Sequence, residues 1–227
     1  KLEQDYALSL QDYDALHRFS LESKEAFWTA VWDFAGIIAE SRGTRVLVDG
    51  DKMPGAQFFP DAKLNFAENL LRRRDETDAL VFWAEDRIKR RMSWRALYEE
   101  VSKLAAALRD LGVKPGDRCA GFLPNAPEAV IAMLASTSVG AVWTSCSPDF
   151  GTQGVIDRFG QVEPKVLFTS DGYIYDGKSY DSLERIAEIL ESLPGVDRTV
   201  VFPYLSASPD IGRIANGVVW ADFISGR

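Results

Sequence analysis

Histidine and cysteine are scarce in this sequence, and their scarcity excludes several kinds of functional site. Among 227 residues there is one histidine, His17, and there are two cysteines, Cys119 and Cys146. These three side chains cannot form a closed zinc site of cysteine and histidine ligands, and a catalytic triad with a histidine base would have to use His17. Because His17 lies in an apolar stretch with Tyr13 and Leu16, we interpret it as a packed or surface residue. The two thiols are interpreted as reduced, with a single disulfide bridge as the alternative.

Long apolar runs and an excess of basic residues are also missing. No stretch reaches the roughly 18 consecutive apolar residues of a membrane-spanning helix, and the first residues contain no apolar signal core. The formal net charge is −8, and the only dense basic clusters are residues 72–74 and 87–91. A negative chain repels the phosphate backbone of nucleic acids. These features predict a soluble, cytoplasmic protein that has neither a membrane nor a nucleic acid as its partner.

The common nucleotide-binding and hydrolase motifs are absent as well. The sequence contains no Gly-x-Gly-x-x-Gly dinucleotide fingerprint and no phosphate loop that ends in Gly-Lys-Ser/Thr. It also lacks a Gly-x-Ser-x-Gly elbow, a His-Glu-x-x-His zinc motif and a recognisable pair of catalytic carboxylates. On its residues alone, the chain is expected to be an α/β module without catalytic apparatus.

Apolar residues are plentiful enough for a packed core, since 46% of the residues are hydrophobic and 11% are aromatic. Residues 1–77 are rich in aromatic side chains and are predicted to form a helical N-terminal cap. Apolar side chains at helical spacing predict one helix over residues 22–39, with its start signalled by Ser20 and Gly43 just beyond its end. A second helix is expected after Pro60.

Residues 78–227 show a different pattern, in which short apolar runs alternate with longer amphipathic stretches. A β-hairpin is predicted first, from a strand at 79–83 through a charged turn at 85–87 to a return strand that ends near Trp94. A helix over 94–111 follows, with Ser93 as N-cap and Gly112 after its end. The further strands are predicted at 118–123, 141–145, 165–169 and 199–202, and the further helices at 126–139, 152–161 and 182–193. This alternation predicts an α/β fold with a mostly parallel sheet and helices on both faces. For the tail from Ser206, three interpretations remain open: a loop, a linker or the start of another element.

Several segments resemble one family, the adenylate-forming acyl-CoA synthetases. The shared motifs are Leu-Asn-Phe-Ala-Glu-Asn-Leu at 64–70, Leu-Gly-Val-Lys-Pro-Gly-Asp-Arg at 111–118, Pro-Asn-Ala-Pro-Glu-Ala-Val at 124–130 and Ser-Val-Gly-Ala-Val at 138–142. More specific is Trp-Thr-Ser-Cys-Ser-Pro-Asp-Phe-Gly at 143–151, followed by Arg158, which is similar to the acetoacetyl-CoA synthetases within that family. The upstream segments 13–20 and 27–32 agree with the same members.

The resemblance implies an ATP-dependent ligase that joins acetoacetate to coenzyme A (CoA) through an acyl-adenylate, with Mg²⁺ as the metal. Such chemistry requires a Ser/Thr/Gly loop that cradles phosphate, Mg²⁺ and a cationic side chain, because negative charge develops in both steps. This chain contains neither the family's Ser-Gly-Thr-Thr-Gly-x-Pro-Lys loop nor the small C-terminal domain with the adenylation lysine. We therefore expect the N-terminal part of a longer enzyme, inactive alone and with no catalytic or metal-binding residue of its own. In fold it should be an incomplete part of the large N-terminal domain of that family.

The family also indicates where CoA binds. By motif position, Phe150 and Arg158 match a loop and helix near the CoA nucleotide, and Gly177 and Lys178 match a basic segment after the next strand. In the first region, residues 147–149 replace the family's Phe-Gly-Gly. Lys178 would meet a phosphate as a point charge, and its alternative is a solvated loop lysine. For Arg158 the alternative is a brace within its own helix.

Two other functions remain open at this stage. The chain is either part of another short-chain acyl-CoA synthetase, for acetate or propionate, or a non-catalytic α/β binding module. In each ligase case the partners are small molecules, namely the carboxylate, ATP and CoA. A truncated sheet would leave an open edge, which predicts self-association of the chain.

Overall fold

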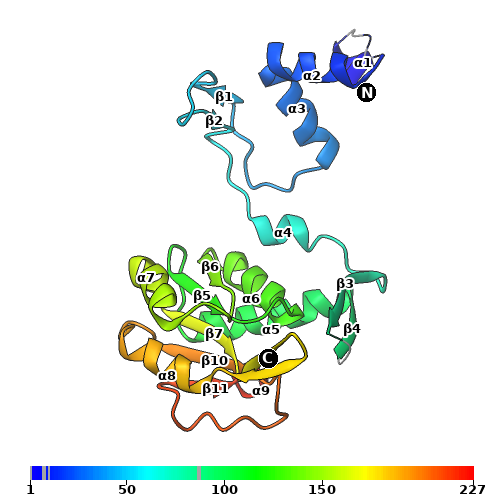
Figure 1. Ribbon diagram of the computed structural model, residues 1–227. Helices are drawn as coiled ribbons and strands as arrows, with labels where there is room; N and C mark the ends of the chain where they lie inside the picture. Colours follow the sequence, from blue (N-terminus) through cyan, green and yellow to red (C-terminus); the bar gives the residue numbers. More distant parts are fainter. Residues whose placement is uncertain (1, 7–8, 10, 86–87) are drawn as a thin grey trace. The chain divides into compact units, whose positions relative to one another are not determined.

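The structure is a computed structural model that describes residues 2–6, 9, 11–85 and 88–227. Asp86 and Arg87 of the expected hairpin turn lie outside the described residues, as does Lys1. The chain forms two compact units, residues 1–65 and residues 66–227, and each is described here by itself (Figure 1).

The first unit consists of short helices and one small antiparallel pair of strands. Its helices are α1 (Leu2–Tyr6), α2 (Tyr13–Glu22) and α3 (Lys24–Ala35), and its strands are β1 (Leu47–Val48) and β2 (Gln57–Phe58). Edge-to-face contacts between aromatic rings run through the unit, from Phe19 in α2 to Phe27 and Trp28 in α3 and on to Phe58 in β2. The expected helical character of this region is confirmed.

The single helix expected over residues 22–39 is wrong in its bounds. The chain breaks at Ser23, which separates α2 from α3 and is the N-cap residue of α3, whereas Ser20, the expected start signal, lies inside α2. The side chain of Asp12 caps the start of α2 by accepting a hydrogen bond from Ala15 N at 2.8 Å. The second helix ends at Gly36 rather than near Gly43, because Gly36 adopts a left-handed conformation with φ 59° that glycine tolerates without steric cost.

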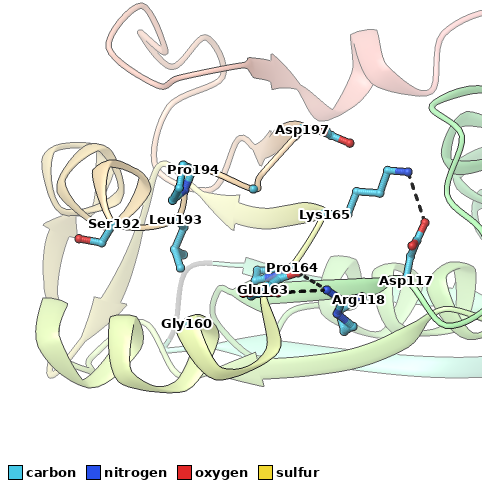
Figure 2. A pocket seen from close by; sticks show the side chains of 11 residues that line it. Asp117, Arg118, Gly160, Glu163, Pro164, Lys165, Ser192, Leu193, Pro194 and Asp197 are labelled. Atoms are coloured by element: carbon cyan, nitrogen blue, oxygen red, sulfur yellow. Dashed lines mark hydrogen bonds and ion pairs between the residues drawn. The ribbon is translucent and has the colours of Figure 1, made fainter.

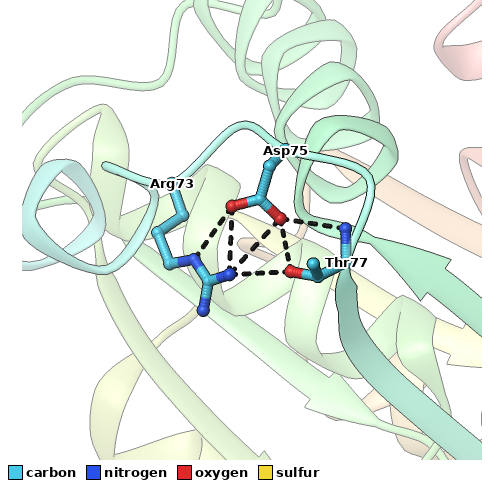
Figure 3. Close-up of polar contacts among 3 residues, drawn as sticks. All are labelled: Arg73, Asp75 and Thr77. Carbon is cyan, nitrogen blue, oxygen red and sulfur yellow. Dashed lines mark hydrogen bonds and ion pairs between the residues drawn. The ribbon is translucent and has the colours of Figure 1, made fainter.

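The second unit begins earlier than the division expected at residues 77 and 78. Helix α4 (Phe66–Leu70) belongs to this unit, because Ala67 and Leu71 are buried in the same core as the helices that follow. A polar link then leads into the sheet region: Arg73 donates to Asp75 and Thr77, and Thr77 N donates to Asp75 Oδ1 at 2.9 Å (Figure 3). Hydrogen bonds from Thr77 first, and the Arg73 guanidinium after them, lower the pKa of Asp75 to about 2.

The predicted hairpin and the helix after it are confirmed. Strands β3 (Asp78–Ala84) and β4 (Ile88–Ser93) pair antiparallel, and helix α5 (Trp94–Asp110) follows directly. Ser93 caps this helix, since its hydroxyl accepts a hydrogen bond from Ala96 N at 3.2 Å, and Gly112 has φ 81° just after the end.

Five parallel strands form the central sheet, which confirms the predicted α/β fold. In order across the sheet they are β11 (Gly217–Val219), β10 (Arg198–Phe202), β7 (Val166–Ser170), β5 (Arg118–Phe122) and β6 (Val142–Cys146). The crossover helices are α6 (Pro127–Ser138), α7 (Thr152–Val162) and α8 (Leu183–Glu191). The tail after Ser206, for which the sequence left three interpretations, contains β11 and a short helix, α9 (Trp220–Phe223).

Helices cover both faces of this sheet, and each face has its own core (Figure 1). Alternate residues of β7 point to opposite faces, so that Val166 and Phe168 join the core beneath α5 and α6 whereas Leu167 joins the core beneath α7 and α8. Strands buried on both faces explain the continuous apolar runs in the sequence. Within the second unit, a second hairpin was not expected: β8 (Gly172–Tyr175) and β9 (Lys178–Asp181) are inserted between β7 and α8.

Candidate functional site

The carboxyl ends of the parallel strands gather the candidate residues at one edge of the sheet. The loop with Phe150 follows β6, and the hairpin with Gly177 and Lys178 follows β7. In open α/β sheets, ligands bind at this edge. Strand β5 lies between β6 and β7, so the two strand ends are about 10 Å apart at a spacing of about 4.8 Å per strand.

The structure brings Phe150 and Arg158 together. The Arg158 guanidinium lies 4.5 Å from the centre of the Phe150 ring, and its Nη1 donates to the carbonyl of Gly154 at 2.9 Å. Arg185 from α8 steadies the same loop, since its Nη1 donates to the Pro148 carbonyl at 3.1 Å. Arg158 therefore braces its own helix, which was the alternative to a role in CoA binding, and it also contacts the Phe150 ring.

Gly177 and Lys178 lie at the tip of the unexpected hairpin. Asp176 and Gly177 are the two turn residues, with φ 51° and 68°, and Lys178 pairs with Tyr175 across the hairpin. An Asp-Gly pair between runs of β-forming residues is the usual sequence of such a two-residue turn, and this signal could have predicted the hairpin. Lys178 is exposed, and the structure gives it no ion pair among the described residues.

A carboxylate that the sequence did not single out occupies this turn. Glu85, the residue directly after β3, accepts hydrogen bonds from Asp176 N at 3.0 Å and from Gly177 N at 2.7 Å. The backbone N–H of Gly177 is thus engaged by Glu85. Within the described residues, no hydrogen bond, ion pair or cation–ring contact joins the pair of Gly177 and Lys178 to the pair of Phe150 and Arg158.

A second carboxylate that the sequence did not single out holds the base of the hairpin. Asp171 is 4% exposed, and its side chain accepts three backbone hydrogen bonds, from Tyr204 at 2.7 Å, Leu205 at 2.9 Å and Ser206 at 2.8 Å. The neighbouring Gly172 permits the close approach, because a Cβ there would lie 2.3 Å from Leu205 Cδ1. Asp171 therefore fixes the loop after β10 against the end of β7.

A pocket lies at the opposite edge of the sheet, at the amino ends of β5, β7 and β10 (Figure 2). It has a volume of about 550 Å³, and its cations serve the backbone: Arg118 donates to the carbonyls of Val162 and Glu163, and Lys165 donates to that of Gly112 at 2.8 Å. The pKa of Asp117 is lowered, first by a hydrogen bond from Lys114 N and then by the hydrogen bond and positive charge of Lys165. These contacts join loops of the framework, so we assign the pocket no ligand.

Several described side chains of the two basic clusters have partners within the chain. Arg73 pairs with Asp75, and Arg74 lies 3.7 Å from the centre of the Tyr98 ring. Arg90 makes two hydrogen bonds to Glu128, at 2.8 and 2.6 Å. Their positive charge is therefore offset locally.

Both thiols are free and buried, as the interpretation of reduced cysteines requires. Burial raises the pKa of Cys119 to about 11 and also raises that of Cys146. Within the described ranges, no group of three or more His, Cys, Asp or Glu side chains is placed to hold a metal ion. The helices described here are all too short or too polar to cross a membrane.

Comparison with known proteins defines the class. Residues 66–214 match the AMP-binding enzyme family, and residues 13–70 match the acetyl-coenzyme A synthetase N-terminus. Because the first match covers more than half of the chain, the chain belongs to the AMP-binding enzyme family.

Within this family the chain is similar to acetoacetyl-CoA synthetases. It is 49% identical to the acetoacetyl-coenzyme A synthetase of Rhizobium meliloti (strain 1021), over 97% of this chain and 34% of the relative, and 40% identical to that of Macaca fascicularis, over 96% and 33%. The solved structure of acetoacetyl-CoA synthetase from Streptomyces lividans superposes with a TM-score of 0.86 at 45% identity, over 94% of this chain and 33% of that one. The chain thus spans about a third of the length of the relatives it matches.

Proposed function

We propose that the chain is the N-terminal part of an ATP-dependent acetoacetate–CoA ligase. The reaction converts acetoacetate, ATP and CoA into acetoacetyl-CoA, AMP and pyrophosphate through an acyl-adenylate. The observation that carries the proposal is the similarity of nearly the whole chain to acetoacetyl-CoA synthetases, at 49% identity over 97% of its length. The buried, reduced thiols agree with a cytoplasmic location.

A second substrate is favoured by another relative. The chain is 36% identical, over 88% of its length, to a protein named malonamoyl-CoA synthetase from Penicillium aethiopicum. Malonamate and acetoacetate are both short carboxylates with a carbonyl at the β position. We therefore propose that the substrate is a short carboxylate with a β-carbonyl group. Acetoacetate is the preferred candidate, malonamate is the second, and acetate or propionate is the least favoured.

The contribution of this chain to the reaction is proposed to be CoA binding rather than chemistry. The candidate contacts are Lys178, as a point charge for a phosphate group, and the Phe150 ring held by Arg158. ATP and Mg²⁺ would act outside this chain, because the Ser/Thr/Gly phosphate loop is absent from its 227 residues. We therefore expect no ATP–pyrophosphate exchange with acetoacetate from the chain alone.

Two measurements test this function. For the whole reading frame, AMP formation that depends on CoA is compared for acetoacetate, malonamate, acetate and propionate, and a higher kcat/KM for acetate than for acetoacetate would overturn the substrate class. For the chain itself, calorimetry compares CoA binding by the wild type, by Lys178→Ala and by Lys114→Ala, a matched exposed lysine at the other edge of the sheet. Weaker binding only in Lys178→Ala supports the site. Equal binding by all three proteins removes Lys178 from it.

A further inference from the structure

The tip of the β8–β9 hairpin has the geometry of an anion-binding turn. Asp176 and Gly177 are consecutive residues with left-handed φ, and their N–H groups both donate to the same carboxylate group. Successive N–H groups in such a turn form a concave site that favours a negative group. In this structure the negative group is the Glu85 carboxylate, with one oxygen on each N–H.

Glu85 is held there only lightly. It is exposed, and its hydrogen bonds within the described part of the chain go to these two N–H groups. Arg90 of the following strand pairs with another carboxylate, because both of its Nη atoms donate to Glu128. Because Glu85 is exposed, water competes for these hydrogen bonds and their net contribution is small, so another anion can replace the carboxylate at small cost.

The position of the turn fits a ligand more highly charged than a carboxylate. The exposed Lys178 follows the turn directly, and the hairpin rises from the carboxyl edge of the sheet, where α/β folds bind ligands. A phosphate monoester carries close to two negative charges near neutral pH and offers three acceptor oxygens. It would gain both N–H groups and the lysine, whereas Glu85 would repel it.

We propose that Glu85 is an intramolecular competitor, which occupies the N–H groups of Asp176 and Gly177 until a phosphate monoester displaces it. The assignment of that phosphate to CoA rests on the proposed function. The exchange between Glu85 and a phosphate group does not, because inorganic phosphate has the same chemistry.

The test follows the amide NMR signals of Asp176 and Gly177 in the whole 227-residue chain. Wild type, Glu85→Gln and the control Glu191→Gln are titrated with CoA, dephospho-CoA and inorganic phosphate. Glu191 is an exposed carboxylate at the end of α8, so its substitution removes the same charge away from the turn. Glutamine keeps the length of the side chain and removes its charge.

Glu85→Gln is expected to bind CoA about three- to tenfold more tightly than wild type, since the competitor and its repulsion are lost, whereas Glu191→Gln is not. Dephospho-CoA should lose this gain if the 3′-phosphate is the group that enters the turn. In another outcome, inorganic phosphate shifts both amide signals, more strongly in Glu85→Gln, while CoA shifts neither. That result supports the exchange between Glu85 and a phosphate group and refutes the assignment of the phosphate to CoA. Equal or weaker binding in Glu85→Gln, or no anion that shifts these amides, overturns the proposal.

Discussion

The buried carboxylate of Asp171 gives the sharpest prediction about how the edge of the sheet is built. Asp171→Asn keeps the size and shape of the side chain but replaces one oxygen by an NH2 group. Oδ1 accepts two of the three hydrogen bonds, from Tyr204 and Leu205, and Oδ2 accepts the third, from Ser206. The asparagine oxygen can take the first two. Its NH2 group then faces the N–H of Ser206, donor against donor.

The expected loss follows from that geometry. One hydrogen bond to a charged acceptor contributes about 1.5–3 kcal/mol, and the two retained bonds weaken because their acceptor becomes neutral. We therefore expect Asp171→Asn to lower the free energy of unfolding of the second unit by about 2–3 kcal/mol. At about 2–4 °C per kcal/mol for a unit of this size, the melting temperature should fall by about 4–12 °C.

Urea unfolding followed through the amide signals of β7 measures this loss in the second unit alone. Asp149→Asn is the matched control, since Asp149 is exposed in the loop after β6 and the same chemical change there should cost less than about 0.5 kcal/mol. If Asp171→Asn and Asp149→Asn have equal stability within 0.5 kcal/mol, the three hydrogen bonds do not hold the loop as described.

Three further predictions concern the thiols, the polar link and the sheet edge. Iodoacetamide at pH 8 should leave Cys119 and Cys146 unlabelled in the folded chain, because burial raises the pKa of both thiols, and should label both in urea. Rapid labelling of either thiol in the folded chain, measured by mass spectrometry, would contradict this. The pKa of Asp75, about 2 in the folded chain, should rise in the variant Thr77→Val, as measured by carboxyl NMR. In the wild type, the ionised Asp75 should stabilise the fold above about pH 4, and this stabilisation should be lost as the pH falls toward 2. If the exposed edge strand β6 causes self-association, Val142→Lys should lower the apparent mass in sedimentation at high concentration, and an unchanged mass would exclude this edge.

The alternation of apolar runs made the second unit predictable. The three inner strands, β5, β7 and β10, are buried on both faces, so they appear in the sequence as short, mostly apolar runs, and the helices between carry one apolar face. Local signals also fixed the ends of α5, since capping by Ser93 and the left-handed Gly112 involve only neighbouring residues.

The first unit was harder to predict because its helices depend on few burial constraints. None of the residues of α3 is fully buried, so the apolar spacing alone could not show where the chain breaks. The break at Ser23 and the early end at Gly36 are set by backbone conformation at single residues.

The sequence by itself determined the α/β class, the motifs of the family and the region where CoA contacts were expected. Only the tertiary structure showed that Gly177 has its N–H engaged by Glu85, more than 90 positions earlier, and that Asp171 closes over the loop at 204–206. The physical reason is that a carboxylate gives no local signal of the N–H groups it will accept. Those partners are chosen by strand order, which brings distant segments to one edge of the sheet.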